Sequence, residues 1–240
     1  MKKLLLLAML GVSAGVTVAD EITDERWWTP VQLNLASPLG LPWADRDVKG
    51  LRMNLIYGHS LDVCGLDFGV VGANRGETVG LQMNGFNYND GIFRGVQLGA
   101  LGSFTVKSSY GVQLAGLINW GIDDNAGLEA GLLNFSVAYT GAQLGFINWD
   151  TGLDEGLGVG FINTAMTDAE GGFVGCFNYC KGNFRGCQIG VFNMAFGQSE
   201  GVQIGVFNAS EDHAGAQIGL LNLNANGKLP LMAVVNVNFR

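Results

Sequence analysis

Gly201-Val-Gln-Ile-Gly-Val-Phe-Asn208 is a clear copy of a repeat whose near-copies recur from about residue 50 almost to the C-terminus. The shared pattern is Gly-x-Gln-apolar-Gly-apolar-apolar-Asn, and successive copies begin 14 to 16 residues apart. Twelve copies begin at Gly50, Gly65, Gly80, Gly95, Gly111, Gly127, Gly141, Gly156, Gly171, Gly186, Gly201 and Gly215. Weaker copies at 30–37 and 229–236 bring the number of units to 14. Such a period is typical of a β-solenoid or of an up-and-down sheet.

The first 19 residues have the features of a secretory signal peptide. A basic Met1-Lys-Lys start precedes an apolar run from Leu4 to about Val18, and small residues stand before a cut after Ala19. The run is too short for a stable transmembrane helix. We therefore predict a signal peptide at 1–19, one repeat domain at 20–240, and an exported protein of the bacterial outer membrane or cell surface.

Composition limits the partners. Without Lys2 and Lys3, 11 basic residues stand against 21 acidic ones, which leaves a net charge near −10. A nucleic-acid surface needs clustered Lys and Arg, so we predict no nucleic-acid partner. Only 14% of the residues are charged, and 48% are hydrophobic. An exported chain this apolar must bury its surface in a core or in lipid, so we predict membrane lipid as a partner.

The linkers between repeats bear on the choice between the two architectures. Their middles are polar and lack a fixed apolar position, which makes them poor interior faces for a coil. If neighbouring units are antiparallel, five 15-residue steps place Gly second in a two-residue turn, and Asp90-Gly91 is a favoured hairpin dipeptide. We therefore predict an all-β fold, in which an antiparallel up-and-down meander closes into an outer-membrane-type β-barrel of roughly 14 strands. The alternative is a β-solenoid with one coil per repeat.

Each unit alternates between two faces. In 201–208, Val202, Ile204, Val206 and Asn208 share one face, and Gln203 lies on the other with the glycines and Phe207. Gln facing lipid is costly, so the barrel turns the Val/Ile face outward and the Gln face towards a lumen. The predicted polar lumen row, a candidate for selecting solutes, is Gln32, Arg52, Asp67, Gln82, Gln97, Gln113, Glu129, Gln143, Gln188, Gln203 and Gln217. Alternatively, these side chains bond only to one another and to water in a plugged barrel.

The cysteines bear on the same choice. Export implies an oxidising compartment, in which disulfides persist. An antiparallel meander sets Cys176 opposite Cys187, and we predict a disulfide between them, whereas a stacked coil places Cys176 over Val191. Cys176-x3-Cys180 lacks the second close pair of a zinc site, and the acidic linker at 150–155 lacks the ligand spacing of a calcium loop. We predict no metal and expect that linker to be a solvated turn.

Catalytic constellations are missing from the sequence. His59 and His213, the two histidines, lie in or beside predicted turns, without a motif that contains a nucleophile or a carboxylate pair. We predict that both are solvated turn residues, that the protein is not an enzyme and that it uses no cofactor.

The repeats at 186–193, 201–208 and 215–222 resemble the unit of a widespread family of bacterial surface-repeat proteins. The stretches 47–57 and 65–69 are similar to the entry segment of that family. This resemblance implies an exported envelope protein with no assigned enzymatic activity. Two hypotheses follow from the sequence: a structural or pore-like outer-membrane protein, or a soluble exported β-solenoid that binds a partner along its Asn and Gln ladder.

Overall fold

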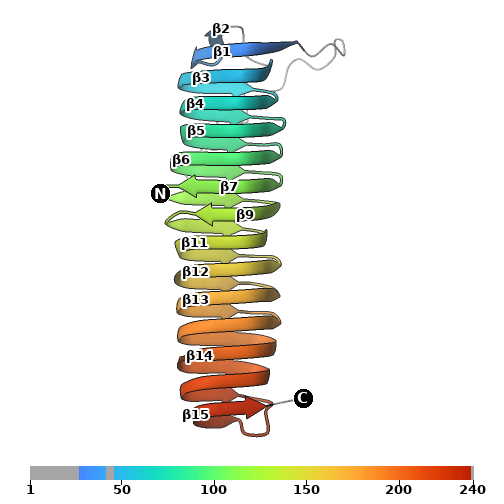
Figure 1. Ribbon diagram of the computed structural model, residues 1–240, viewed down its shortest axis with the longest axis vertical. Helices are drawn as coiled ribbons and strands as arrows, with labels where there is room; N and C mark the ends of the chain where they lie inside the picture. Colours follow the sequence, from blue (N-terminus) through green and yellow to red (C-terminus); the bar gives the residue numbers. More distant parts are fainter. Residues whose placement is uncertain (1–26, 42–45, 239–240) are drawn as a thin grey trace, which may run out of the picture.

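Stacked coils build the described part of the chain. The computed structural model describes residues 27–41 and 46–238, so the predicted signal peptide lies outside the described residues. The described chain winds into a β-solenoid of about 11 turns, a straight and elongated stack (Figure 1). The strands are β1 (Trp28–Ala36), β2 (Leu39–Leu41), β3 (Asp47–Ser60), β4 (Val63–Asn74), β5 (Thr78–Asn89), β6 (Phe93–Thr105), β7 (Ser109–Ala115), β8 (Ile118–Gly121), β9 (Asp124–Ala130), β10 (Leu133–Ser136), β11 (Ala138–Asp150), β12 (Asp154–Ala165), β13 (Ala169–Cys180), β14 (Phe184–Asn224) and β15 (Leu231–Asn238).

Neighbouring coils pair in parallel, with like positions of the repeat side by side. Gly156 in β12 pairs with Gly141 in β11 and with Gly171 in β13. Among the described strands, antiparallel pairing is limited to β1 with β2 and β14 with β15, which lie at the two ends of the sheet. The predicted antiparallel barrel is therefore wrong, and the alternative, a solenoid with one coil per repeat, is confirmed.

The glycines of the linkers explain why the hairpin prediction failed. A Cβ atom added to Gly91 would meet the carbonyl of Gly76, and one added to Gly197 would meet the backbone of Gly182. These glycines therefore stack on one another at a corner of successive coils, where they allow the backbones to approach closely. A tight hairpin and a solenoid corner need the same residue type, so Asp90-Gly91 did not distinguish them.

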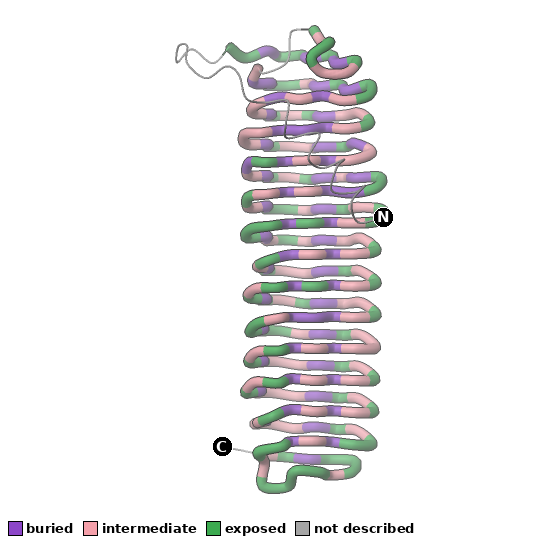
Figure 2. Tube along the Cα trace, turned by 180° about the vertical axis from the view of Figure 1, so that it is seen from behind, coloured by how far each residue is buried: buried purple, intermediate pink, exposed green. Residues whose placement is uncertain are grey.

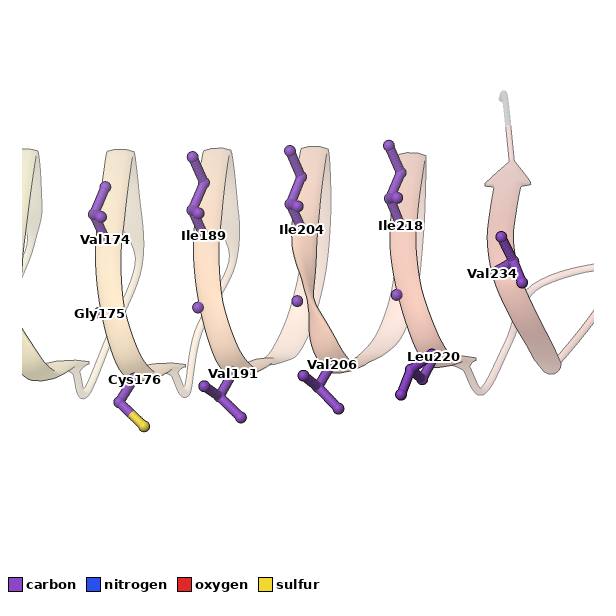
Figure 3. Close-up of a pocket in the computed structure, with 13 residues that line it drawn as sticks. Val174, Gly175, Cys176, Ile189, Val191, Ile204, Val206, Ile218, Leu220 and Val234 are labelled. Carbon is purple, nitrogen blue, oxygen red and sulfur yellow. The ribbon is translucent and has the colours of Figure 1, made fainter.

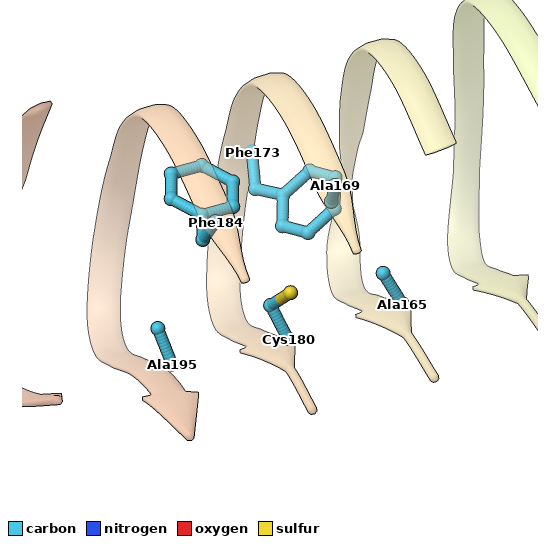
Figure 4. Close-up of a cluster of buried hydrophobic side chains, with 6 residues drawn as sticks. All are labelled: Ala165, Ala169, Phe173, Cys180, Phe184 and Ala195. Carbon is cyan, nitrogen blue, oxygen red and sulfur yellow. The ribbon is translucent and has the colours of Figure 1, made fainter. Parts of the chain in front are cut away.

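The interior of the coils is mostly polar, which removes the second argument for a barrel. Buried positions recur in each coil along the stack (Figure 2), and most of them carry Gln, Asn, Ser or Thr. A smaller apolar cluster fills β12 to β14, where Ala165, Cys180 and Ala195 share one column and the rings of Phe173 and Phe184 lie 5.5 Å apart (Figure 4). Linkers without a fixed apolar residue are therefore compatible with this interior.

The first glycine of each repeat sets the path of the coil. All twelve have positive φ, between 126° and 157°, a region that side-chain-bearing residues rarely adopt. At Gly201, φ is 126° and a Cβ atom would collide with the carbonyl oxygen of Gly186 in the preceding coil. Both the backbone angle and the close stacking therefore require glycine here.

Replacing Gly201 by alanine is expected to lower the free energy of unfolding by about 2 to 4 kcal/mol, because strain and overpacking add. Chemical denaturation followed by far-ultraviolet circular dichroism measures the change. Val202→Ala at the next, half-buried position is the control and should cost about 1 kcal/mol. Equal losses of unfolding free energy in the two variants would contradict the requirement for glycine at position 201.

Candidate functional site

The predicted lumen row lies inside the solenoid. All eleven side chains are buried, and none is more than 3% exposed. Gln217 donates a hydrogen bond to Gln203 (2.8 Å), and Gln203 donates one to Gln188 (2.7 Å). Because the chain forms a solenoid, this row fills a packed interior and lines no lumen. Its amides bind one another and are out of reach of a solute.

A second ladder, of asparagines, runs beside the first. Asn178 Nδ2 donates to Oδ1 of Asn193 (2.8 Å) and to the carbonyl of Ile189 (3.0 Å), and the same pair of bonds recurs at Asn163, Asn193 and Asn208 with the next Asn and a backbone carbonyl. Strict alternation placed Asn208 on the outer face together with Val206, and this is wrong, because Val206 is 47% exposed whereas Asn208 is 0% exposed. The Asn ladder thus holds the coils together, and it offers no binding surface.

One buried ion pair interrupts the glutamines near the N-terminal end. Arg52 in β3 stacks on Asp67 in β4, and Arg52 Nε donates to Oδ1 of Asp67 (2.8 Å). Asn54 and Gln82 donate further hydrogen bonds to this carboxylate, at 2.7 and 2.9 Å. The charges are fully enclosed by partners, so this pair acts on stability and not on ligands.

Three carboxyl groups are buried in the middle of the stack. Glu129 in β9, Asp150 at the end of β11 and Asp154 at the start of β12 are each at most 4% exposed. Gln143 Nε2 donates to Oε2 of Glu129 (3.2 Å) and to Oδ1 of Asp150 (3.0 Å). The expected solvated turn at 150–155 is therefore wrong for its two aspartates, which close the coil interior.

The pKa values of these three carboxyl groups are raised, and burial is the largest cause. It raises the pKa of Glu129 to about 7 and that of Asp154 to about 6. Burial, together with repulsion from Asp154 and Glu129, raises the pKa of Asp150 well above its usual range. These side chains hold protons at pH values where exposed carboxyl groups are ionised.

His213 lies inside the last coils, and the predicted solvated position is wrong. Its Nδ1 atom is 2.6 Å from Oγ of Ser199, which in turn is 2.7 Å from Oγ of Ser210. Burial lowers the pKa of His213. The pair has the contact distance of a nucleophile and a base, but Ser199 is 0% exposed and a substrate cannot reach it.

The predicted disulfide is absent, and this prediction is wrong. Cys64, Cys176, Cys180 and Cys187 are free. The 15-residue register of β13 on β14 aligns Gly175 with Gly190 and Phe177 with Phe192, so Cys176 stacks beside Val191. Cys187 pairs with Gly172 instead of Cys176. The parallel register separates the two sulfur atoms that a hairpin would have joined.

Cysteine labelling is expected to follow burial. Cys64 is exposed, whereas Cys180 is buried and its pKa is raised to about 12, chiefly by burial. We expect iodoacetamide to modify Cys64 within minutes and to leave Cys180 unmodified until the protein unfolds, because the thiolate is the reacting form. Mass spectrometry of proteolytic peptides measures both rates. Rapid modification of Cys180 in the folded protein would contradict its enclosure.

The outer surface carries a straight apolar groove along the last coils of the stack. In each of the last coils one apolar residue forms a ridge, the next residue is a glycine that forms the floor, and a second apolar residue forms the far wall (Figure 3). The groove has a volume of about 850 Å³. Its lining residues are Val174, Gly175, Cys176, Ile189, Gly190, Val191, Ile204, Gly205, Val206, Ile218, Gly219, Leu220 and Val234.

The same three repeat positions are hollowed further along the molecule. A stretch of about 450 Å³ is lined by residues from Met83 to Gly116, and one of about 760 Å³ by residues from Leu33 to Val70. None of the residues that line these three stretches is charged. The sequence signal for these hollows is a repeating triplet of two apolar residues around a glycine, which Asn54, Asn84 and Ala115 replace in some coils. The predicted barrel assigned the two apolar residues of each triplet to a lipid-facing wall.

Charged side chains gather at the polar corner of the coil. Arg185 lies between Glu170 and Glu200 of the neighbouring coils, at 3.2 and 3.3 Å, and all three side chains are exposed. The surface is therefore divided around the circumference of the solenoid. The corner is charged and hydrated, whereas the groove is apolar and uncharged.

Comparisons with protein-family models, with curated proteins and with solved structures found no match for this chain. The resemblance to bacterial surface-repeat proteins thus stays a prediction. Within the described ranges, no group of three or more His, Cys, Asp or Glu is arranged to hold a metal ion. The described part of the chain contains no helix long and apolar enough to cross a membrane.

Proposed function

We propose that this protein is an exported, non-enzymatic β-solenoid that serves as a binding module, and that the apolar groove is its contact surface. The main support for this proposal is that the interior of the solenoid is polar whereas its outer groove is apolar. The side chains of the Gln and Asn ladders, which the sequence presented as a binding face, are buried and hydrogen-bond to one another inside the coil. The groove, in contrast, leaves a row of aliphatic side chains in water.

The exposure of this row supports a role in binding. Val174, Ile189, Ile204 and Ile218 are 38 to 42% exposed, and Val206 is 47% exposed. Contiguous apolar surface of this kind is costly in water, and in soluble proteins it marks contact sites for proteins or lipids. The hydrogen-bonded ladders make the solenoid a rigid rod, so the groove keeps its shape and loses little conformational entropy on binding.

Photo-crosslinking in living cells tests this proposal. A photoreactive benzoylphenylalanine at Ile204, in the groove, is expected to give covalent adducts on illumination. The same residue at Gln198, beside the charged corner, is the matched control and is expected to give few. Adducts at position 198 without adducts at position 204 would assign the contact surface to the polar corner and refute the proposal.

A further inference from the structure

The apolar ridge beside the groove has a shape that can fill the groove of an identical molecule. The ridge of Val174, Ile189, Ile204 and Ile218 runs directly next to the floor of Gly175, Gly190 and the glycines that follow (Figure 3). Both features run parallel to the solenoid axis and repeat once per coil. A surface with a ridge adjoining a groove of the same pitch can bury itself against an identical surface.

The ridge, the floor and the far wall of the groove together form an apolar band. The area of this band is large enough for a stable dimer interface. About 11 turns at the usual strand spacing of about 4.8 Å give a length of about 50 Å, and three to four residues at about 3.3 Å give a width of about 10 to 13 Å. Exposed apolar side chains at the ridge or far-wall position occur along this length, among them Met53, Leu132 and Ile218. The band therefore offers about 500 to 650 Å² per copy. The total of about 1,000 to 1,300 Å² reaches the lower range of specific protein interfaces.

We propose that a second copy of this chain covers the groove, an inference that rests on the proposed function of the groove as a contact surface. The ridge of each copy lies on the glycine floor of the other. Both copies have the same rise per coil, so over the last coils each ridge residue of one copy meets a glycine of its partner. In coils nearer the N-terminus Asn54, Asn84 and Ala115 take the place of that glycine. No lining residue brings a charge into this contact.

The order of ridge and floor also determines the orientation of the two copies. A twofold axis parallel to the solenoid axis exchanges the two sides of the band, so each ridge meets the partner's floor. A twofold axis across the band reverses the rods and sets ridge against ridge. The copies are therefore parallel, and Ile204 of one copy lies close to Ile204 of the partner, near the twofold axis.

Size-exclusion chromatography with light scattering, on the purified mature chain without detergent, measures the association. The wild type is expected to have twice the mass of one chain. The triple variant Ile189→Thr, Ile204→Thr and Ile218→Thr keeps β-branched side chains and is expected to dissociate at concentrations on the order of 100-fold higher or more. The control carries Val96→Thr, Val112→Thr and Val202→Thr, outside the groove, and should remain dimeric. Circular dichroism verifies that both variants are folded.

Disulfide trapping tests the parallel orientation. In the cysteine-free background each thiol is replaced by the residue at the same repeat position of the next coil: Cys64→Val, Cys176→Val, Cys180→Ala and Cys187→Val. Ile204→Cys is then expected to form a covalent dimer on mild oxidation, whereas Gln198→Cys at the corner is expected not to. A dimer that Ile204→Cys fails to trap overturns the parallel arrangement.

The behaviour of the wild-type protein distinguishes the proposed dimer from the proposed function of the groove as a contact surface. A monomeric wild type that floats with phosphatidylcholine vesicles, or that gives groove adducts of another mass in cells, overturns the second copy and leaves the proposed function standing. A monomer that gives no adduct at position 204 overturns both. A monomeric chain is thus sufficient to refute this inference, even if the triple variant fails to fold.

Discussion

Replacing Arg52 by glutamine is expected to lower the free energy of unfolding by about 3 to 5 kcal/mol, because the carboxylate of Asp67 is left buried without its cation. Asp67 is 1% exposed, and water cannot replace the guanidinium. The hydrogen bonds from Asn54, Gln82 and Asn84 remain, but amides compensate a charge only in part. Urea denaturation at pH 7 measures the loss.

The double variant Arg52→Gln, Asp67→Gln separates the ion pair from its position in the stack. Gln is the residue that most other coils carry here, and it continues the ladder that Gln97 and Gln82 form at 2.9 Å. We expect the double variant to recover to within about 1 kcal/mol of the wild type, since replacing a whole buried pair costs much less than removing one partner. The single variant Asp67→Gln completes the cycle. If the losses of unfolding free energy in Arg52→Gln and Asp67→Gln sum to the loss in the double variant, the two residues are uncoupled.

The second large effect is a loss of stability as the pH rises. Glu129 holds its proton in the folded protein up to a pKa of about 7, whereas its ordinary value is 4.5. The folded state therefore binds more protons between these values, and its advantage is full below pH 4.5 and lost as the pH rises through 7. At 1.36 kcal/mol per pKa unit, Glu129 alone accounts for about 3 kcal/mol. Asp154, with a pKa raised to about 6, acts in the same direction.

Glu129→Gln isolates this effect, because it removes the ionisable group and keeps the shape. The difference in unfolding free energy between the variant and the wild type is expected to be near zero at pH 4 and to reach about 3 kcal/mol in favour of the variant at pH 8. Glu155→Gln, at an exposed position of the same acidic stretch, is the control and should leave the pH dependence unchanged. A constant difference across the pH range for Glu129→Gln would mean that the carboxyl group is ionised in the fold.

The positions of the repeat units, and which of their residues are buried, could be predicted from the sequence. The predicted starts of the twelve units are the twelve glycines with positive φ, and the predicted inward row from Gln32 to Gln217 is buried. Arg52 and Asp67, two members of that row, pair with each other in the structure. These features depend on period and polarity, which are local properties of the chain.

The direction of neighbouring coils could not be read in the same way. A glycine-containing linker suits both a hairpin and a solenoid corner, so the prediction of antiparallel strands, with Cys176 opposite Cys187, rested on an ambiguous signal. The break in the alternation between Val206 and Asn208 could not be predicted either, and it places Asn208 in the interior while Val206 stays exposed. His213, Asp150 and Asp154 were expected in water because polar residues in linkers usually lie there, and the polar interior overrode that expectation.

A β-repeat with glycine at a fixed backbone position, a buried amide row and an apolar surface all follow from the residues of one unit, because each depends on what that unit can bury or expose. The stacking of like residues on like residues is a property of the assembled coils and does not follow from one unit. That parallel register turns Asn into an internal ladder, leaves the cysteines free and aligns Val174, Ile189, Ile204 and Ile218 into one ridge beside a glycine floor. The groove exists only where coils are stacked, because one coil contributes a single residue to each of its walls.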